Sequence, residues 1–229
     1  INCDPSKLSE AELHRITTTF VSLVREVIGP TIDIPAPDVN TNATIMSWIM
    51  DEYSKFYGFS PGVVTGKPVD LFGSLGREEA TGRGVMYALE ECLKESGREL
   101  SDVSVAIQGF GNVGSHAARL IHERGGKIVA VSDISGGLRN DNGLDIPALL
   151  DWVARNKVVE GFPGGDKVDG AAVLTGKCDV LIPAALEAAV TADNVADVQA
   201  EIVVEAANGP LTPDAHEILV GRGVTVIPD

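Results

Sequence analysis

The chain has 229 residues, 44% of them hydrophobic, which is enough for one large or two small domains with a buried core. Its formal net charge of −15 disfavours nucleic acid or an anionic membrane as a partner. Its apolar runs are shorter than the ~18 residues of a membrane helix, and its first residues do not resemble a signal peptide, so we expect a cytoplasmic protein. Three cysteines without paired spacing predict free thiols and no metal site.

The first part of the chain predicts two helices joined by a stiff loop. Residues 8–28 have amphipathic spacing and begin with a capping box formed by Ser9 and Glu12. The prolines of the following PAPDVNT segment exclude a helix and present Asp38 on an extended loop. The residues alone favour a cap or turn role for Asp38 or Asn42 at the start of the next helix, near residues 43–56.

A glycine-rich segment then separates these helices from the rest. Residues 57–76 contain five glycines and two prolines, but also apolar residues that argue against disorder. Ordered loops longer than ~12–15 residues are usually functional, so this segment is a candidate wall of an active site. A helix is predicted from Arg77 to just before Gly97, leading directly into the next strand.

Residues 103–133 have the pattern of a dinucleotide site. An apolar run ends at GFGNVG, and a helical pattern follows. Gly109 permits the tight turn, Gly111 permits close approach of a pyrophosphate, and Gly114 permits close packing of helix and strand. A second apolar run ends at Asp133, 19 residues after Gly114, near the ~20 typical of the acid that binds the ribose. The predicted cofactor-binding residues here are Gly109, Phe110, Gly111, Asn112, Val113, Gly114 and Asp133.

The remaining chain alternates between apolar runs and helical segments. We predict a turn at 135–143, a helix capped by Asp145, and strands at 178–182, 201–205 and 224–227. This rhythm predicts an α/β fold with a Rossmann-like, doubly wound and mostly parallel sheet flanked by helices. Residues 61–229 would form this dinucleotide-binding domain, and residues 1–60 a helical segment from a substrate domain or its hinge.

Several motifs together resemble one enzyme family. PAPDVNT, PGVVTGKP, GSLGREEATGRGV, QGFGNVGSHAA, IPAALE and EAANGPLTPDA occur in the order found in the glutamate/leucine/phenylalanine/valine dehydrogenases. The resemblance covers nearly the whole chain and is closest to the glutamate members. It implies oxidative deamination of L-glutamate to 2-oxoglutarate and ammonia with NAD or NADP, in a homo-oligomer that is usually a hexamer.

The resemblance also implies roles for individual residues. Asp38 would be the catalytic aspartate that exchanges a proton with the substrate amine, in contrast to the cap role that the residues alone favour. Arg77 would lie near the substrate carboxylate, and Thr81 would contact the nicotinamide carboxamide. Ala185 and Asn208, in loops that follow two predicted strands, would touch the riboses and nicotinamide of the cofactor.

Two family motifs are missing. Members carry a glycine-rich loop with the catalytic lysine before a segment like INCDPSKLS, and an asparagine-glycine motif after one like VIPD. Neither occurs here, so we expect a fragment that binds the cofactor without turning over glutamate. Lys67 and Lys94 lie outside the family's lysine motif and are not predicted to replace that lysine.

Some alternatives stay open at this point. The chain can belong to a leucine, phenylalanine or valine dehydrogenase, to a hydroxy-acid dehydrogenase, or to a nucleotide-sensing domain without catalysis. Asp133 favours NAD because a 2′-phosphate would meet a like charge. Lys127, Ser132 and Arg139 favour NADP, so we predict a preference for NAD below about a hundredfold.

Overall fold

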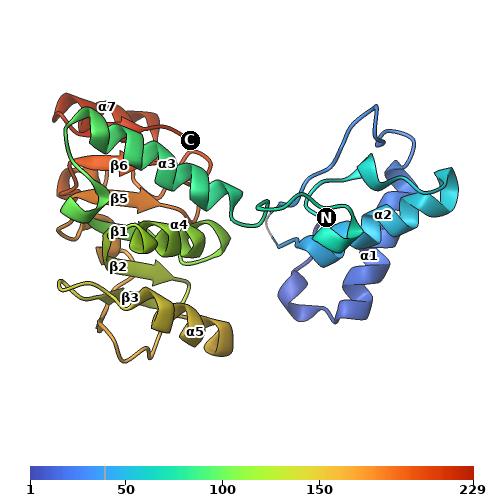
Figure 1. Ribbon diagram of the computed structural model, residues 1–229, viewed down its shortest axis with the longest axis horizontal. Coiled ribbons are helices and arrows are strands. Elements are labelled where there is room, and N and C mark those ends of the chain that lie inside the picture. Colours follow the sequence, from blue (N-terminus) through green and yellow to red (C-terminus); the bar gives the residue numbers. More distant parts are fainter. Residues whose placement is uncertain (39) are drawn as a thin grey trace. The chain divides into compact units, whose positions relative to one another are not determined.

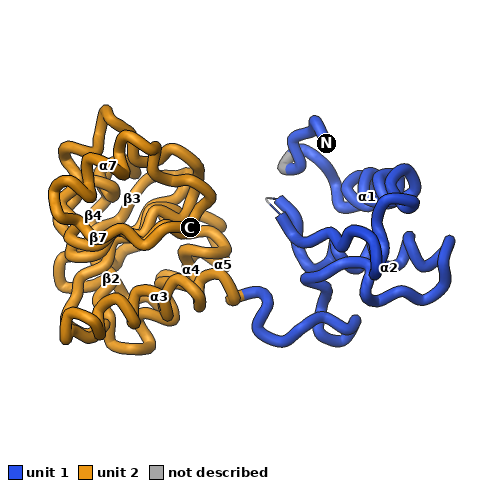
Figure 2. Tube along the Cα trace, turned by 90° about the horizontal axis from the view of Figure 1, so that it is seen from above, with its two compact units in different colours: residues 1–78 blue, residues 79–229 orange. Residues whose placement is uncertain are grey.

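The structure is a computed structural model that describes residues 1–38 and 40–229. It contains two compact units, Ile1–Glu78 and Glu79–Asp229 (Figure 2). The boundary expected from the sequence, after residue 60, falls inside the first unit. Each unit has its own apolar core.

Unit 1 is built on two helices, α1 (Glu10–Val24) and α2 (Ala43–Tyr57), with short 3-10 turns at Pro5–Lys7, Pro61–Val63 and Val69–Leu71. The predicted capping box of Ser9 and Glu12 is present, which explains where α1 begins. α1 ends earlier than expected, because residues 25–27 form turns instead of a last helical turn. The buried side chains of this core are Val21, Ile28, Ile45, Met46, Ile49, Met50, Tyr53, Val63 and Val64.

The residue that caps α2 is Asn42. Its side-chain oxygen accepts a hydrogen bond from the Ile45 N–H at 3.0 Å. Asp38 instead forms a turn with Thr41, since its N–H donates to Thr41 Oγ1 at 2.7 Å and its carbonyl accepts from the same hydroxyl at 2.6 Å. Val39, within the PAPDVNT segment, lies outside the described residues. The cap role considered for Asp38 therefore belongs to Asn42.

Unit 2 contains a seven-stranded sheet in the order β4-β3-β2-β1-β5-β6-β7 (Figure 1). The pairs formed by β1, β2, β5, β6 and β7 are parallel, and those of β3 with β2 and β4 are antiparallel. This is the predicted Rossmann-like, mostly parallel sheet. The strands are β1 Ser104–Gln108, β2 Lys127–Asp133, β3 Gly136–Arg139, β4 Asp166–Val168, β5 Val180–Pro183, β6 Ile202–Val204 and β7 Thr225–Ile227.

Helices cover both faces of this sheet. One core contains buried residues of α3 (Ala80–Glu95), α4 (Asn112–Glu123) and α5 (Ile146–Asn156) against one side of the strands. The other core contains those of α6 (Ala172–Thr175) and α7 (Pro213–Gly221) against the opposite side. Burial on both faces explains why the central strands are almost wholly apolar.

Two predictions about local structure are wrong. The segment 135–143, predicted as a turn, contains β3, which folds back on β2 and pairs Gly136 with Asp133. Its glycines conceal the strand in the sequence, because only Leu138 adds a large apolar side chain. The helix predicted from Arg77 begins at Ala80, since residues 75–79 form turns and Gly76 has a left-handed φ of 79°.

The chain order of the strands creates a switch point beside β1. After β1 the chain builds β2, β3 and β4 on one side, and then returns to place β5 on the other side of β1. Loops that follow β1 and β5 therefore leave the sheet in opposite directions. In open α/β sheets this is where ligands bind, at the carboxyl ends of the strands.

Candidate functional site

Three loops meet at the carboxyl edge of the sheet. The Gly109 N–H, just after β1, donates to the Ser132 carbonyl of β2 at 2.9 Å. The Ala184 N–H, just after β5, donates to the Gln108 carbonyl at 2.7 Å, and the Ala206 N–H, after β6, donates to the Pro183 carbonyl at 3.1 Å. The predicted GFGNVG, PAAL and AANG loops are thus joined by main-chain hydrogen bonds.

Two glycines of GFGNVG are required by packing. Gly109 has a φ of 100°, and a Cβ on it would lie 2.8 Å from both the Cβ and the N of Ala185. A Cβ on Gly114 would lie 1.8 Å from the Gly109 carbonyl oxygen. These contacts place the Ala185 loop against the glycine turn, and they explain why both positions lack a side chain.

Gly111 differs from both, because a Cβ there would have no heavy atom of the chain within 4 Å. It is the N-cap of α4, with a φ of −89° and no side-chain hydrogen bond. The first residues of α4 are Asn112, Val113 and Gly114, whose N–H groups lie at the positive end of the helix dipole. Phe110 is 4% exposed and packs in the core, so only its main chain is available to a ligand.

Asp133 ends β2 at the same edge, and its carboxylate is already hydrogen-bonded. Oδ1 accepts from the Ser135 N–H at 2.7 Å and from the Ser135 hydroxyl. Oδ2 accepts from the Val159 N–H, in the loop after α5, at 2.7 Å. The sequence predicted the position of Asp133 but gave no indication of these partners.

A cavity of about 370 Å³ brings Thr81 of α3 together with Asn208, which follows β6. Its wall also contains Glu205 and Asp229, two acids that the sequence analysis did not select. Burial and the Asp229 carboxylate raise the pKa of Glu205 above its ordinary value. The position of Glu205 immediately after a buried strand was the signal that could have identified it.

α3 and α4 approach closely beside this cavity. A Cβ on Gly82 would lie 2.7 Å from the Ala117 N and 2.9 Å from the Val113 carbonyl oxygen. Glu79, at the start of α3, forms ion pairs with Arg83 and with Arg119 of α4. The Glu79–Arg119 pair therefore links the two helices, and Arg119 is also paired with Glu123 of its own helix at 2.7 Å.

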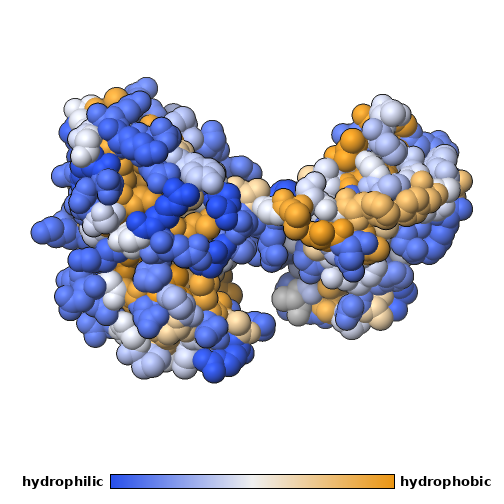
Figure 3. Space-filling model, viewed as in Figure 1, coloured by the Kyte–Doolittle hydropathy of each residue, from blue (hydrophilic) through white to orange (hydrophobic). Residues whose placement is uncertain are grey.

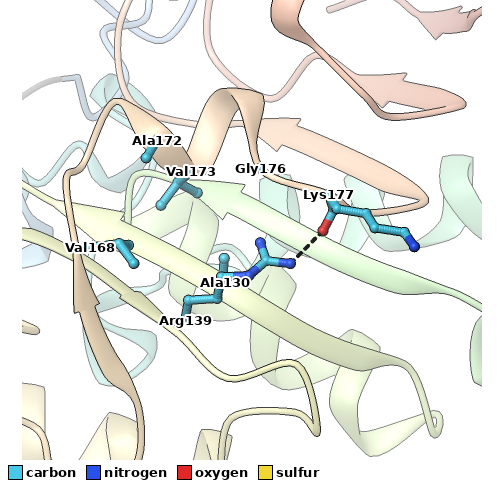
Figure 4. A pocket seen from close by; sticks show the side chains of 7 residues that line it. All are labelled: Ala130, Arg139, Val168, Ala172, Val173, Gly176 and Lys177. Carbon is cyan, nitrogen blue, oxygen red and sulfur yellow. Dashed lines mark hydrogen bonds between the residues drawn. The ribbon is translucent and has the colours of Figure 1, made fainter.

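Arg139 and Lys127 lie away from the carboxyl edge, contrary to the role considered for them. Arg139 ends β3 opposite Ala130, and its guanidinium donates to the Lys177 carbonyl at 2.8 Å and pairs with Asp141 at 2.7 Å. It lines a separate cavity of about 310 Å³ (Figure 4). Lys127 is the first residue of β2 and Asp133 is the last, so the two lie at different ends of the strand.

The remaining two predicted residues, Asp38 and Arg77, belong to unit 1. The Thr65 N–H donates to the Pro35 carbonyl at 3.0 Å, and a Cβ on Gly66 would lie 2.1 Å from Pro37 Cγ. The TGKP loop therefore supports the loop that carries Asp38. Arg77 is exposed in the turns that precede α3.

Lys67, in the same TGKP loop, is the one charged residue among those that the structure describes as buried. It is 7% exposed and its ammonium donates to the Val64 carbonyl. Burial lowers its pKa. The hydrogen bond closes the loop on itself, which gives this lysine a structural role.

Within the described residues, no group of three or more His, Cys, Asp or Glu side chains is arranged to hold a metal ion. None of the described helices is long and apolar enough to cross a membrane.

The family model for glutamate/leucine/phenylalanine/valine dehydrogenase matches residues 73–229, and the model for the dimerisation domain of the same enzymes matches residues 1–55. The chain belongs to this family. The two matched ranges fall in both units, so the resemblance seen in the sequence is confirmed for each of them.

Individual relatives are glutamate dehydrogenases. The chain is 48% identical to the catabolic NAD-specific glutamate dehydrogenase RocG of Bacillus subtilis, over 100% of this chain and 54% of that protein. The hetero-hexameric glutamate dehydrogenase of Thermus thermophilus, in a leucine-bound form, matches with a TM-score of 0.93 and 38% identity, over 99% and 54% of the two chains. The glutamate dehydrogenase of Peptoniphilus asaccharolyticus matches with a TM-score of 0.76 and 40% identity, over the same shares. The chain thus spans about half the length of these relatives.

Proposed function

We propose that the protein to which this chain belongs oxidatively deaminates L-glutamate to 2-oxoglutarate and ammonia, with NAD as hydride acceptor, and that unit 2 binds the cofactor. The observation that carries this proposal is the open position at Gly111, beside the uncapped N-terminus of α4 and on the same sheet edge as Asp133. The 48% identity to an NAD-specific glutamate dehydrogenase supports it.

The carboxyl edge of the sheet fits a dinucleotide. The main-chain N–H groups at the start of α4 would bind the pyrophosphate, and Gly111 leaves space for it. When bound, the cofactor supplies the hydride acceptor of the reaction. The chain's proposed contacts to it are those of Gly109, Phe110, Gly111, Asn112, Val113, Gly114, Asp133, Ala185, Asn208 and Thr81.

The substrate would be handled by residues of unit 1 and by parts of the protein outside this chain. Asp38 would exchange a proton with the substrate nitrogen, as a general acid and base. Its loop is supported by Thr65 and Gly66, which suits a group that must hold its position. Arg77 would bind the substrate carboxylate through its planar guanidinium.

NAD is the favoured cofactor. A 2′-phosphate beside Asp133 would meet a like charge. Arg139, which the sequence offered as a partner for that phosphate, lies away from this edge, is paired with Asp141 and is bound to the Lys177 carbonyl. This removes one argument for NADP that the sequence had left open.

We propose that the protein assembles as a homo-oligomer through unit 1. Large apolar side chains are exposed on this unit (Figure 3), and residues 1–55 match a dimerisation domain. Leu23 is 81% exposed and Ile32 is 67% exposed. Analytical ultracentrifugation of the protein should give a mass several times that of one chain, and a monomer would contradict assembly.

The activity is tested by following the absorbance of reduced nicotinamide in the full-length protein with L-glutamate, L-leucine, L-phenylalanine and L-valine. We expect glutamate with NAD to give the highest kcat/KM. The 229-residue chain alone should give no turnover with any of them. A higher kcat/KM for another of these amino acids would contradict the proposed substrate, and no turnover of any of them by the full-length protein would contradict the proposed reaction.

A further inference from the structure

The Asp133 carboxylate is held by two different segments. Its Oδ1 accepts two bonds from Ser135, and its Oδ2 accepts one from the Val159 N–H at 2.7 Å. Ser135 also accepts from the Glu160 N–H at 3.1 Å. The Ser135 hydroxyl therefore joins the turn after β2 to the loop after α5.

This second loop is firmly packed. Val159 is completely buried, and Phe162 is 7% exposed with its ring against Trp152 at a centroid distance of 6.2 Å. Ile134, between Asp133 and Ser135, is 99% exposed and faces outward. The polar groups of Asp133 and Ser135 point inward, toward each other and toward the loop after α5. The carboxylate of Asp133 is thus fixed against a rigid part of unit 2.

The number of free acceptor positions limits what the Asp133 carboxylate can bind. A carboxylate offers roughly four lone-pair positions, two on each oxygen. Ser135 occupies both positions on Oδ1, and Val159 occupies one on Oδ2. One position on Oδ2 remains, which suits a single ribose hydroxyl.

We propose that Ser135 is a positioning residue that determines cofactor specificity, by fixing Asp133 so that its charge cannot turn away from a 2′-phosphate. This rests on the proposed binding of NAD at the carboxyl edge. A freely rotating carboxylate would relieve the repulsion at small cost, whereas a fixed one retains it. The discrimination against NADP then depends on the hydroxyl of Ser135 as well as on Asp133.

The test uses the full-length protein and the dissociation constants of NAD and NADP, measured by isothermal titration calorimetry. In Ser135→Ala both hydroxyl bonds are lost while the N–H bond to Asp133 remains. We expect the ratio of the NADP constant to the NAD constant to fall roughly three- to tenfold, the size expected for the loss of one hydrogen bond of ordinary strength. Ser135→Thr, which restores the hydroxyl, should return the ratio to that of the unmodified protein.

The variant Asp133→Asn shows whether a negative result contradicts the role of Ser135 or the proposed binding of NAD. If Asp133→Asn lowers the ratio and Ser135→Ala leaves it unchanged, Asp133 acts without Ser135 and the inference is wrong, while NAD binding at this edge stands. If the unmodified protein binds neither nucleotide, the proposed function itself fails. A thermal melt of each variant shows whether the fold is retained, and a Ser135→Ala protein that unfolds is replaced by Ser135→Cys, whose thiol is a weaker donor and should lower the ratio in the same direction.

Discussion

A methyl group added at Gly111 should weaken the binding of NAD and leave the packing of the chain unchanged. Its φ of −89° suits any residue, and no heavy atom of the chain lies within 4 Å of a Cβ there. In the 229-residue chain, Gly111→Ala should therefore fold, with a loss of stability of at most about 1 kcal/mol because alanine is a poorer N-cap than glycine. It should bind NAD at least about tenfold more weakly, a loss of ~1.4 kcal/mol. Calorimetric titration measures this change. Gly221→Ala, at another open position at the end of α7, is the control and should not affect binding. Equal affinity for NAD in the unmodified chain, Gly111→Ala and Gly221→Ala would show that the pyrophosphate does not bind at this turn.

Glu205 predicts a pH-dependent change in stability. Burial and the nearby Asp229 carboxylate raise its pKa in the folded chain above the ordinary 4.5. The folded state therefore holds this proton more tightly than the unfolded state, and its stabilising effect is lost as pH rises through the raised pKa. Glu205→Gln should raise the melting temperature by roughly 1–2 °C at neutral pH and by nothing below pH 4.5. Scanning calorimetry at both pH values measures the difference. Glu217→Gln, on the exposed side of α7, is the control. A gain at acid pH only would contradict the assignment.

Cys178 predicts a difference in thiol reactivity. Burial raises its pKa to about 12, so almost no thiolate forms at neutral pH. Cys3 is exposed. A chromogenic disulfide reagent should therefore modify Cys3 in the native chain, and Cys178 only after denaturation. Rapid labelling of Cys178 in the native state, seen by mass spectrometry of peptides, would contradict the burial of this side chain just before β5.

At the scale of elements, the contact between α3 and α4 can be tested with two neighbouring glycines. Gly82→Ala places a methyl 2.7 Å from the Ala117 N, whereas Gly84→Ala on the same helix meets nothing within 4 Å. We expect Gly82→Ala to lower the free energy of unfolding by about 1–3 kcal/mol, and Gly84→Ala to raise it by about 0.5–1 kcal/mol. Urea unfolding with Trp48→Phe, which leaves Trp152 as the fluorescent probe of unit 2, measures both. Equal effects would show that the two helices do not pack through Gly82.

The sequence predicted those elements that have strong periodicity or clear end signals. The Ser9–Glu12 box and the Asp145 cap are where they were expected, because each depends on side chains within one turn of helix. β3 was missed because its pairing with β2 depends on a distant partner strand and not on its own glycine-rich residues. The helix α6, only four residues long, had no local signal either.

The main-chain features of the candidate site were predictable from the sequence, but the partners of its side chains were not. Main-chain features, such as the glycine turn after β1 and the acid that ends β2, follow from motif spacing. The Val159 N–H, one of the three donors to Asp133, was not predictable, because Val159 lies 26 positions away in the sequence. For the same reason Arg139 was thought to be available to a phosphate, although it is bound to the Lys177 carbonyl 38 positions further on.

At the scale of the whole molecule, variants of Asp38 and Asn42 distinguish a catalytic role from a structural one. In the full-length protein, Asp38→Asn should lower kcat by roughly 10²–10⁴-fold with NAD affinity nearly unchanged, because the proton exchange is lost. Asn42→Ala removes the cap of α2 and should lower stability by about 1 kcal/mol with kcat nearly unchanged. Steady-state kinetics and thermal melts of both variants measure these effects. The reverse pattern would make Asp38 the structural residue.

The binding of a dinucleotide at the carboxyl edge of unit 2 is tested most directly by amide hydrogen exchange of the 229-residue chain with and without NAD. Exchange reports which backbone segments a ligand protects. We predict slower exchange at residues 109–115, in the glycine turn and the first turn of α4, and at residues 133–135, where β2 ends. Unchanged exchange in these segments, or protection confined to residues 168–177 beside the cavity that Arg139 lines, would contradict the account.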